Sequence, residues 1–168
     1  MNKEFNGERL KEARIYCGIT VADLAKKLGC QRQTVSNYEN GKSSPTVDFV
    51  INNIARTLEF PPKYFMEKKT NVAIGSTYFR ALLTTNKMYR AEQIQKMEIV
   101  AEIYNFLRDY IVFPELDIIE AESKNPEEAA MALREKWGLS DKPIENIIHV
   151  VEEHGILVTS FSTNTDDI

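Results

Sequence analysis

Two short amphipathic segments joined through a single glycine constrain the fold more than any other feature of the sequence. The first spans residues 20–28 and opens on Thr20, with the acid Asp23 three residues later, a pattern that caps a helix. Gly29 follows its last apolar residue, which is where a helix ends. The second segment, residues 31–40, begins almost at once. The spacing therefore predicts two helices that cross at a tight turn.

A tight crossing needs a small residue at the contact and a turn residue that is free in φ, and Ala25 and Gly29 meet these needs. The second helix can anchor itself through Val35 and Tyr38, which leaves its other side chains for the outer surface. Amide, guanidinium and hydroxyl groups at such a surface match the edges of bases in DNA. The residues predicted to lie there are Gln31, Arg32, Gln33, Thr34, Ser36 and Asn37.

Three more short helices are expected around this pair, giving a first domain over residues 1–66. One precedes it and ends at Gly18, one is capped by Thr46, and the last begins at the proline pair of residues 61–62. Residues at helical spacing, most of them apolar, predict the inward faces. They are Leu10, Ala13, Arg14 and Cys17 in the first helix, and Val47, Val50, Ile51 and Ile54 in the fourth.

Residues 7–66, and above all the stretch "GITVADLAKKLGCQRQTVSNYENGKSSP", resemble the XRE or Cro/C1-type helix-turn-helix family. The resemblance implies a five-helix, lambda-repressor-like domain in which Arg14 pairs with Glu39. Val21 stands where the family commonly has a glutamine that touches a phosphate, so that contact is not expected here. The residues that the resemblance assigns to the DNA backbone are Thr20, Gln31, and Lys42 and Ser43 in the loop over residues 40–44.

The charge of the chain is divided unevenly along its length. The whole sequence carries a net charge of −4, but residues 1–70 hold 12 basic and 8 acidic side chains, and the remainder holds 9 and 17. The first part therefore has a net charge of +4 and the second −8. Such an asymmetry predicts two functional units, of which the basic one is the candidate for binding a polyanion such as a double-stranded DNA operator.

Beyond a predicted linker over residues 67–87, residues 88–168 are expected to be a helical segment that leads into a small α/β unit. A long helix over residues 88–113 carries two apolar stripes. This breadth suits either a helix at the centre of its own domain or one shared across a dimer interface. Asn125 and Pro126 open another helix, and residues 144–151 have helical periodicity. Residues 156–161 alternate as a β-strand does.

Residues 76–168 resemble the region that leads into the ImmA/IrrE metallopeptidase domain, through Trp137-Gly138-Leu139 and Glu153-His154-Gly155 among others. The zinc-binding H-E-x-x-H of that family is absent from the chain. Zinc is therefore expected only if a longer parent protein carries the peptidase domain. His149 and His154 are five residues apart, about 140° around a helix, which is unsuited to holding one metal ion. We expect no catalytic residue, metal site or cofactor in this chain.

Two free cysteines, Cys17 and Cys30, lack metal or disulfide spacing and are expected to be buried thiols. The longest uncharged run is far too short to cross a membrane, so the chain is placed in the cytoplasm.

Together these features favour a sequence-specific DNA-binding transcriptional regulator. We expect a repressor of a prophage or other mobile element that binds as a homodimer, with residues 31–40 in the major groove. Two alternatives stay open. One is the N-terminal fragment of a zinc-dependent peptidase that cleaves a repressor. The other is an antitoxin whose acidic segment from Pro114 onward binds a partner protein.

Overall fold

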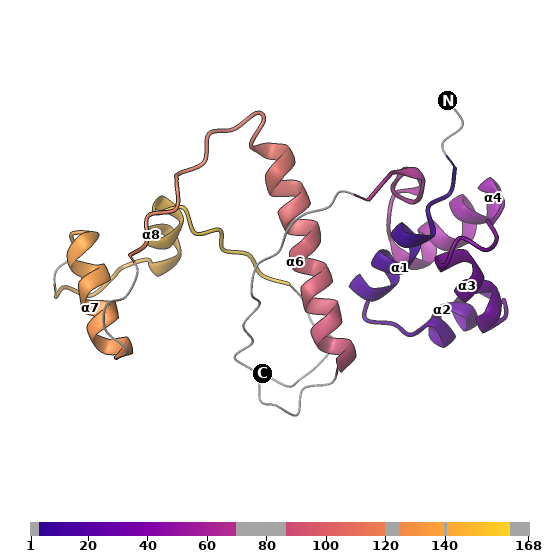
Figure 1. The fold of residues 1–168 in the computed structure, drawn as a ribbon, viewed down its shortest axis with the longest axis horizontal. Helices are drawn as coiled ribbons and strands as arrows, with labels where there is room; N and C mark the ends of the chain where they lie inside the picture. The colour runs from indigo at the N-terminus through magenta and orange to yellow at the C-terminus, as the bar shows by residue number, and fades with distance from the viewer. Residues whose placement is uncertain (1–3, 70–86, 120–124, 140, 162–168) are drawn as a thin grey trace. The chain divides into compact units, whose positions relative to one another are not determined.

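The fold of the chain, in a computed structural model, is mainly helical, as the sequence predicts (Figure 1). The structure describes residues 4–69, 87–119, 125–139 and 141–161. Most of the predicted linker, residues 70–86, lies outside the described residues. The helical elements are α1 (Gly7–Tyr16), α2 (Val21–Leu28), α3 (Arg32–Glu39), α4 (Val47–Phe49), the π-helical turn η1 (Val50–Ile54), α5 (Ala55–Leu58), the 3₁₀ helix η2 (Pro62–Met66), α6 (Lys87–Leu107), α7 (Pro126–Lys136) and α8 (Ile147–Glu153).

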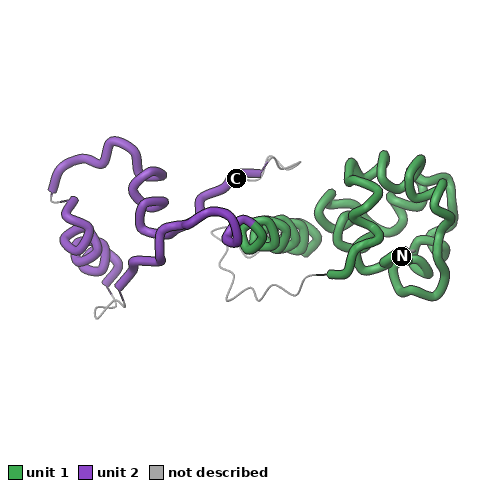
Figure 2. The backbone as a smooth tube through the Cα atoms, turned by 90° about the horizontal axis from the view of Figure 1, so that it is seen from above, with its two compact units in different colours: residues 1–106, 168 green, residues 107–167 purple. Residues whose placement is uncertain are grey.

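The chain divides into two compact units, with the boundary between Phe106 and Leu107 (Figure 2). Unit 1 holds the elements from α1 to η2 and nearly all of α6. Unit 2 holds α7 and α8. The domain boundaries expected at residues 66 and 87 both fall within unit 1.

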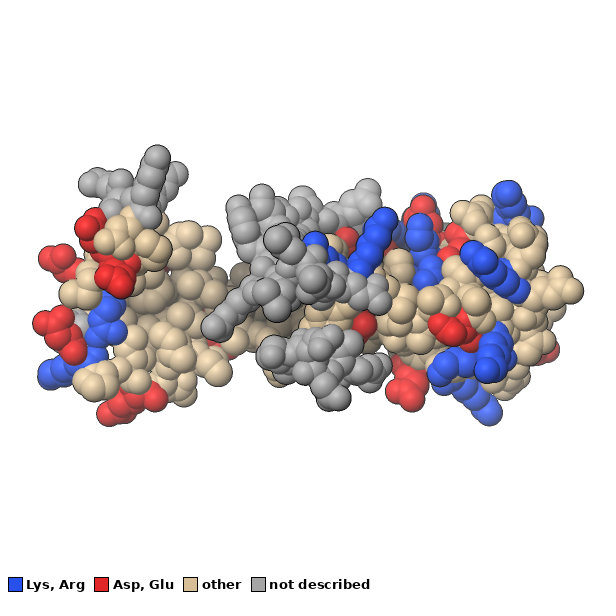
Figure 3. Space-filling view, turned by 90° about the horizontal axis from the view of Figure 1, so that it is seen from below, with Lys and Arg blue, Asp and Glu red and all other residues tan. Residues whose placement is uncertain are grey.

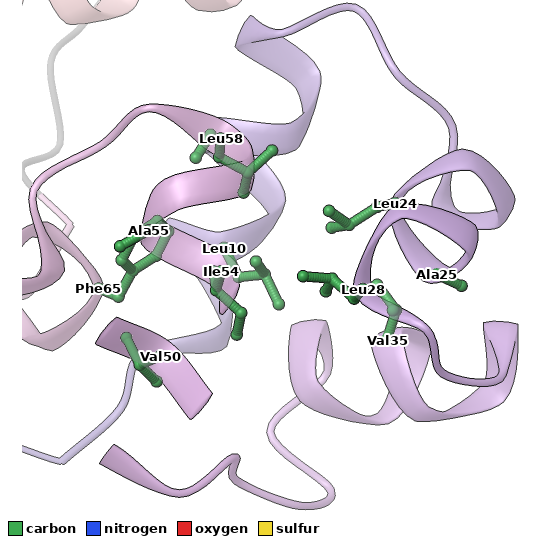
Figure 4. Packing of buried hydrophobic residues seen from close by; sticks show 11 residues of the cluster. Leu10, Leu24, Ala25, Leu28, Val35, Val50, Ile54, Ala55, Leu58 and Phe65 are labelled. Atoms are coloured by element: carbon green, nitrogen blue, oxygen red, sulfur yellow. The ribbon is translucent and has the colours of Figure 1, made fainter. Parts of the chain in front are cut away.

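The core of unit 1 is built by α1, α2, α3 and the helical stretch from η1 to η2. Its largest fully buried side chains include Leu10, Leu24, Ile54 and Phe65, each with no solvent exposure. Figure 4 shows these side chains meeting between the helices. Because each helix contributes one apolar face, burial of these side chains holds the short helices together where their own propensity would not.

The fourth predicted helix differs from expectation in the face that it buries. Val50 and Ile54 are fully buried, but Val47 is 62% exposed and Ile51 41% exposed. Val47 lies in the first turn after the Thr46 cap, before the π-helical turn η1 begins at Val50. The buried face runs from Val50 through Ile54 to Leu58, and Ile51 lies outside it.

A buried ion-pair network joins α1 to α6 within unit 1. Arg9 is only 4% exposed, and its Nη1 lies 3.0 Å from Glu12 Oε2 and 3.1 Å from Glu102 Oε1. Its Nη2 donates to the carbonyl of Lys68 at 2.9 Å. Lys69 Nζ lies 2.8 Å from the other oxygen of Glu12. Each buried charge thus has an opposite charge or a hydrogen-bond partner, the condition for burying it at tolerable cost.

The long helix α6 buries polar residues, contrary to what its two apolar stripes suggest. Glu92, Gln95 and Lys96 are its buried residues, with Lys96 Nζ 2.6 Å from Glu92 Oε1. By contrast, Met97 is 44% exposed and Ile103 53% exposed. The helix also ends at Leu107, six residues before the predicted end. The polar side of α6 is the one in contact with α1, where Glu102 pairs with Arg9 and Lys96 Nζ lies 5.7 Å from the centroid of the Tyr16 ring. Periodicity alone does not show these partners.

In unit 2, α7 begins as the sequence predicts. Asn125 accepts a hydrogen bond from the Glu127 N–H, and Pro126 is the first helical residue. Trp137 donates from Nε1 to the carbonyl of Asp117 at 2.9 Å, and its ring stacks on that of His154 with the centroids 4.1 Å apart. His149 instead lies on the surface, where its Nε2 is 3.2 Å from Glu153 Oε1.

The predicted strand over residues 156–161 is wrong. This segment follows α8 with neither helix nor strand, and no strand occurs in the part of the chain that the structure describes. A strand is held by hydrogen bonds to a second strand, so alternation alone does not make one. None of the described helices is long and apolar enough to cross a membrane.

Candidate nucleic-acid interface

The turn between α2 and α3 depends on Gly29, whose φ of +66° is in the left-handed region. The Gly29 N–H donates to the carbonyl of Lys26, and the Cys30 N–H donates to that of Ala25 at 3.0 Å. These bonds satisfy the last carbonyls of α2 while the chain reverses. A residue with a Cβ would adopt this φ only at a cost, because the Cβ crowds the backbone there. The crossing predicted from Ala25 and Gly29 is therefore formed.

Helix α3 is anchored on one side and exposed on the other. Val35 is fully buried, and Tyr38 packs its ring edge-on to Phe5 at 6.3 Å between centroids. The polar residues predicted for the outer surface gather on the remaining sides of the helix. Gln31, Arg32 and Gln33 are exposed, and Thr34, Ser36 and Asn37 are partly exposed.

An ion pair fixes the far end of α3 against α1. Arg14 Nε lies 2.5 Å from Glu39 Oε1, and Arg14 Nη2 lies 3.0 Å from Glu39 Oε2. The third nitrogen, Nη1, donates to the carbonyl of Ile19 at 2.9 Å. Both side chains are mostly buried, with exposures of 11% for Arg14 and 7% for Glu39. The pair that the family resemblance implies is thus present, with two-point geometry that suits a guanidinium and a carboxylate.

Gly7 also sets the position of α3, and the sequence patterns did not single it out. It begins α1, and a Cβ built on it would collide with the backbone carbonyl of Tyr38 near the end of α3. Only glycine allows this approach without a shift. The signal available in the sequence was Asn6, which caps α1 by accepting from the Glu8 N–H. That cap marks the start of α1 but gives no information about the contact of Gly7 with Tyr38.

The loop after α3 holds the two other predicted backbone-contact residues, Lys42 and Ser43, both exposed. Gly41 has a φ of +67°, and the Lys42 N–H donates to the carbonyl of Asn37 at 2.9 Å. Asn40 Nδ2 donates to the carbonyl of Ser36 at 2.7 Å. The loop is therefore tied to the last turn of α3, and Lys42 follows directly after the candidate reading surface.

Thr20, the remaining predicted contact, caps α2. Its hydroxyl accepts from the Asp23 N–H at 3.1 Å and donates to Asp23 Oδ2 at 2.5 Å, while its own N–H donates to that same oxygen at 3.1 Å. These hydrogen bonds hold the pKa of Asp23 below its usual value. The hydroxyl is thus engaged within the chain, and any contact of Thr20 with a phosphate stays a prediction.

Replacing Thr20 with alanine is expected to lower the stability of the domain by about 1 kcal/mol, because a helix cap is lost. The same change should raise the pKa of Asp23 toward its ordinary value, as measured by a carboxyl titration with NMR. In the unmodified chain, the stabilisation linked to Asp23 is present above about pH 4 and falls away as the pH drops through the lowered pKa. An unchanged Asp23 titration in the variant would contradict this role.

Figure 3 shows lysine and arginine side chains spread over one face of the N-terminal domain.

The two cysteines do not have the environment of reactive thiols. Cys17 and Cys30 are only partly exposed, and burial raises the pKa of both thiols. Within the described ranges, His, Cys, Asp and Glu side chains form no group of three or more suited to a metal ion.

Comparison with known proteins gives matches to the part of the chain that contains α2 and α3. The helix-turn-helix family model matches residues 10–65. The chain is similar to a protein of Methanococcoides burtonii, with 39% identity over 46 residues, and to one of Archaeoglobus fulgidus, with 47% identity over 38 residues. Both are described as "Putative HTH-type transcriptional regulatory protein".

These matches cover 27% and 23% of this chain, and 14% and 12% of the respective relatives. No solved structure gives a significant match. The downstream resemblance to the ImmA/IrrE region stays a prediction. Residues 10–65 are an XRE-type helix-turn-helix domain, built on the crossing of α2 and α3.

Proposed function

We propose that the chain is a sequence-specific DNA-binding transcriptional regulator whose helix α3 enters the major groove. The observation that carries the proposal is the two-sided character of α3 in a helix-turn-helix domain. Its apolar side is anchored by Val35, and its exposed side offers Arg32 and two amides. These groups are donors and acceptors of the kind that read base edges. The relatives described as transcriptional regulators support the same role.

Backbone contacts would come from the loop that follows α3. Lys42 and Ser43 are exposed beside the end of the helix, where a phosphate-contacting group must stand if the helix lies in the groove. Contacts of this type set the register of the domain on DNA and do not select the sequence. They also make the affinity fall steeply with salt.

The regulator would act as a homodimer on two half-sites about 34 Å apart. A first segment with a net charge of only +4 neutralises few phosphates, so one copy alone should bind weakly. Two linked copies gain affinity because the second contact becomes intramolecular. No observation favours the antitoxin or the peptidase-fragment alternative over this function.

The test is selection of a binding site from randomised duplex DNA, followed by affinity measurement through fluorescence anisotropy. We expect the chain to select a two-part site with half-sites about one helical turn apart. Arg32→Ala should weaken binding to that site roughly 5- to 150-fold, because a bidentate base contact is lost. Lys63→Ala is the charge-matched control, since Lys63 is exposed in η2 rather than in α3. A chain that enriches no sequence, even at low salt, would overturn the proposal.

A further inference from the structure

Two amide side chains on the exposed side of α3 are joined to each other. Gln33 Nε2 donates to Asn37 Oδ1 at 2.9 Å, across one helical turn. Gln33 is exposed and Asn37 partly so, and the fully buried Val35 between them faces the core. Gln and Asn at this spacing stabilise a helix slightly. The bond also determines which donor and acceptor groups of the Gln33 amide remain for a ligand.

The bond leaves Gln33 with one free N–H and its Oε1 acceptor, since a primary amide has two N–H donors and one is used. In the major groove, adenine presents an acceptor at N7 and a donor at N6, which match this remaining pair. Guanine presents two acceptors, N7 and O6, and Gln33 has only one donor left for them. Its Oε1 would then oppose a base acceptor with no hydrogen between them.

We infer that Gln33 reads an adenine and that Asn37 is the positioning residue that orients its amide. This inference rests on the proposed DNA-binding function. If Gln33 alone turned its amide over, its Oε1 would meet Asn37 Oδ1, and two acceptors would face each other. The bond also fixes the rotamer before binding, so less side-chain entropy is lost on the DNA.

The opposite arrangement of the pair makes a different prediction. If Asn37 donated from Nδ2 to Gln33 Oε1, both N–H groups of Gln33 would be free and would suit the two acceptors of guanine. The base selected opposite Gln33 therefore distinguishes the two arrangements. A surface pair with no reading role would select neither base.

The experiment compares sites selected from randomised duplexes by the full chain and by four variants. Gln33→Ala should abolish the preference at one position per half-site, where the unmodified chain prefers adenine over guanine by roughly 5- to 150-fold. Asn37→Ala should move that same position toward equal binding of adenine and guanine. Asn37→Asp keeps an acceptor for Gln33 Nε2 and has no donor, so it should retain adenine even though its charge weakens binding overall.

Asn53→Ala is the matched amide control, because Asn53 is exposed in η1, outside α3 and the loop that follows it, and has no part in the pair. It should leave the Gln33 position unchanged. Thermal unfolding followed by circular dichroism checks that each variant folds; the exposed side chains should shift it little.

Selection of guanine at the Gln33 position, or an unchanged preference in Asn37→Ala, would overturn the inference and leave the proposed function standing. So would equal weakening at every position in Asn37→Ala, which indicates a structural role only. Failure of the unmodified chain to select any sequence would overturn both the proposed function and this inference.

Discussion

Glu39→Ala is expected to lower the free energy of unfolding of the N-terminal domain by about 3–5 kcal/mol. Removing the carboxylate leaves the Arg14 guanidinium mostly buried, with the Ile19 carbonyl as its remaining partner among the bonds described above. A buried charge without a counter-charge is costly because it has lost its water and gained nothing in exchange. The loss should appear as a lower midpoint in chemical unfolding followed by far-ultraviolet circular dichroism.

Two controls separate this effect from a general loss of charge. Lys63→Ala breaks a surface pair with Glu67, whose atoms are 3.8 Å apart and whose lysine side chain is 78% exposed, so it should cost at most about 1 kcal/mol. The double variant Arg14→Met with Glu39→Leu should recover most of the lost stability, because no charge remains buried. A Glu39→Ala variant as stable as Lys63→Ala would contradict this prediction, because it would mean that the Arg14 guanidinium does not stay buried without a counter-charge.

The same substitution bears on function, because Glu39 is the last residue of α3. Loss of the pair frees the end of the helix from α1, and a reading helix that moves by about an ångström loses base contacts. Trp137 is the only tryptophan and lies in unit 2, so its fluorescence follows that unit. Unchanged Trp137 fluorescence in Glu39→Ala would show that the damage is confined to the domain that contains the pair.

Phe65→Ala should also cost about 3–5 kcal/mol, because a large side chain is removed from a closed core. Phe65 has no solvent exposure, and its ring lies edge-on to Tyr64 with centroids 5.6 Å apart. Its backbone carbonyl accepts from the Asn6 N–H at 2.7 Å, which holds η2 beside the start of α1. The cavity left by alanine would therefore lie where the two ends of the domain meet.

Unfolding midpoints in urea measure this effect, and Val47→Ala is the matched control. Val47 is apolar but 62% exposed, so its truncation should change the stability by no more than about 0.5 kcal/mol. Equal costs for the two variants would contradict the position of the core, which buries Phe65 and leaves Val47 exposed.

Much of the domain was predictable because its signals are local. Thr20 and Asp23 are three residues apart, so the cap of α2 depends on atoms within a single turn of helix. Gly29 ends α2 for an equally local reason, its backbone conformation. Val35 was predicted as an anchor because the surrounding side chains are polar. The outward residues of α3 follow from the same contrast.

The structure differs from the sequence-based expectation where a residue's environment comes from a distant segment. Val47 and Ile51 have helical spacing with Val50 and Ile54, but the core covers only Val50 and Ile54. Arg9 is buried through contacts with Glu102, which is 93 residues away in the chain. Residues 156–161 have the alternation of a strand but lack a strand partner among the described residues.

The sequence by itself determined where most helices begin and end and which side of α3 is polar, since caps, glycine turns and periodicity act within a few residues. Only the tertiary structure decided that Gly7 lies against Tyr38, that Arg9 is buried beside Glu102, and which face of α6 is covered. The physical reason is that burial and ion pairing depend on the partner across the contact. A local pattern carries no information about that partner.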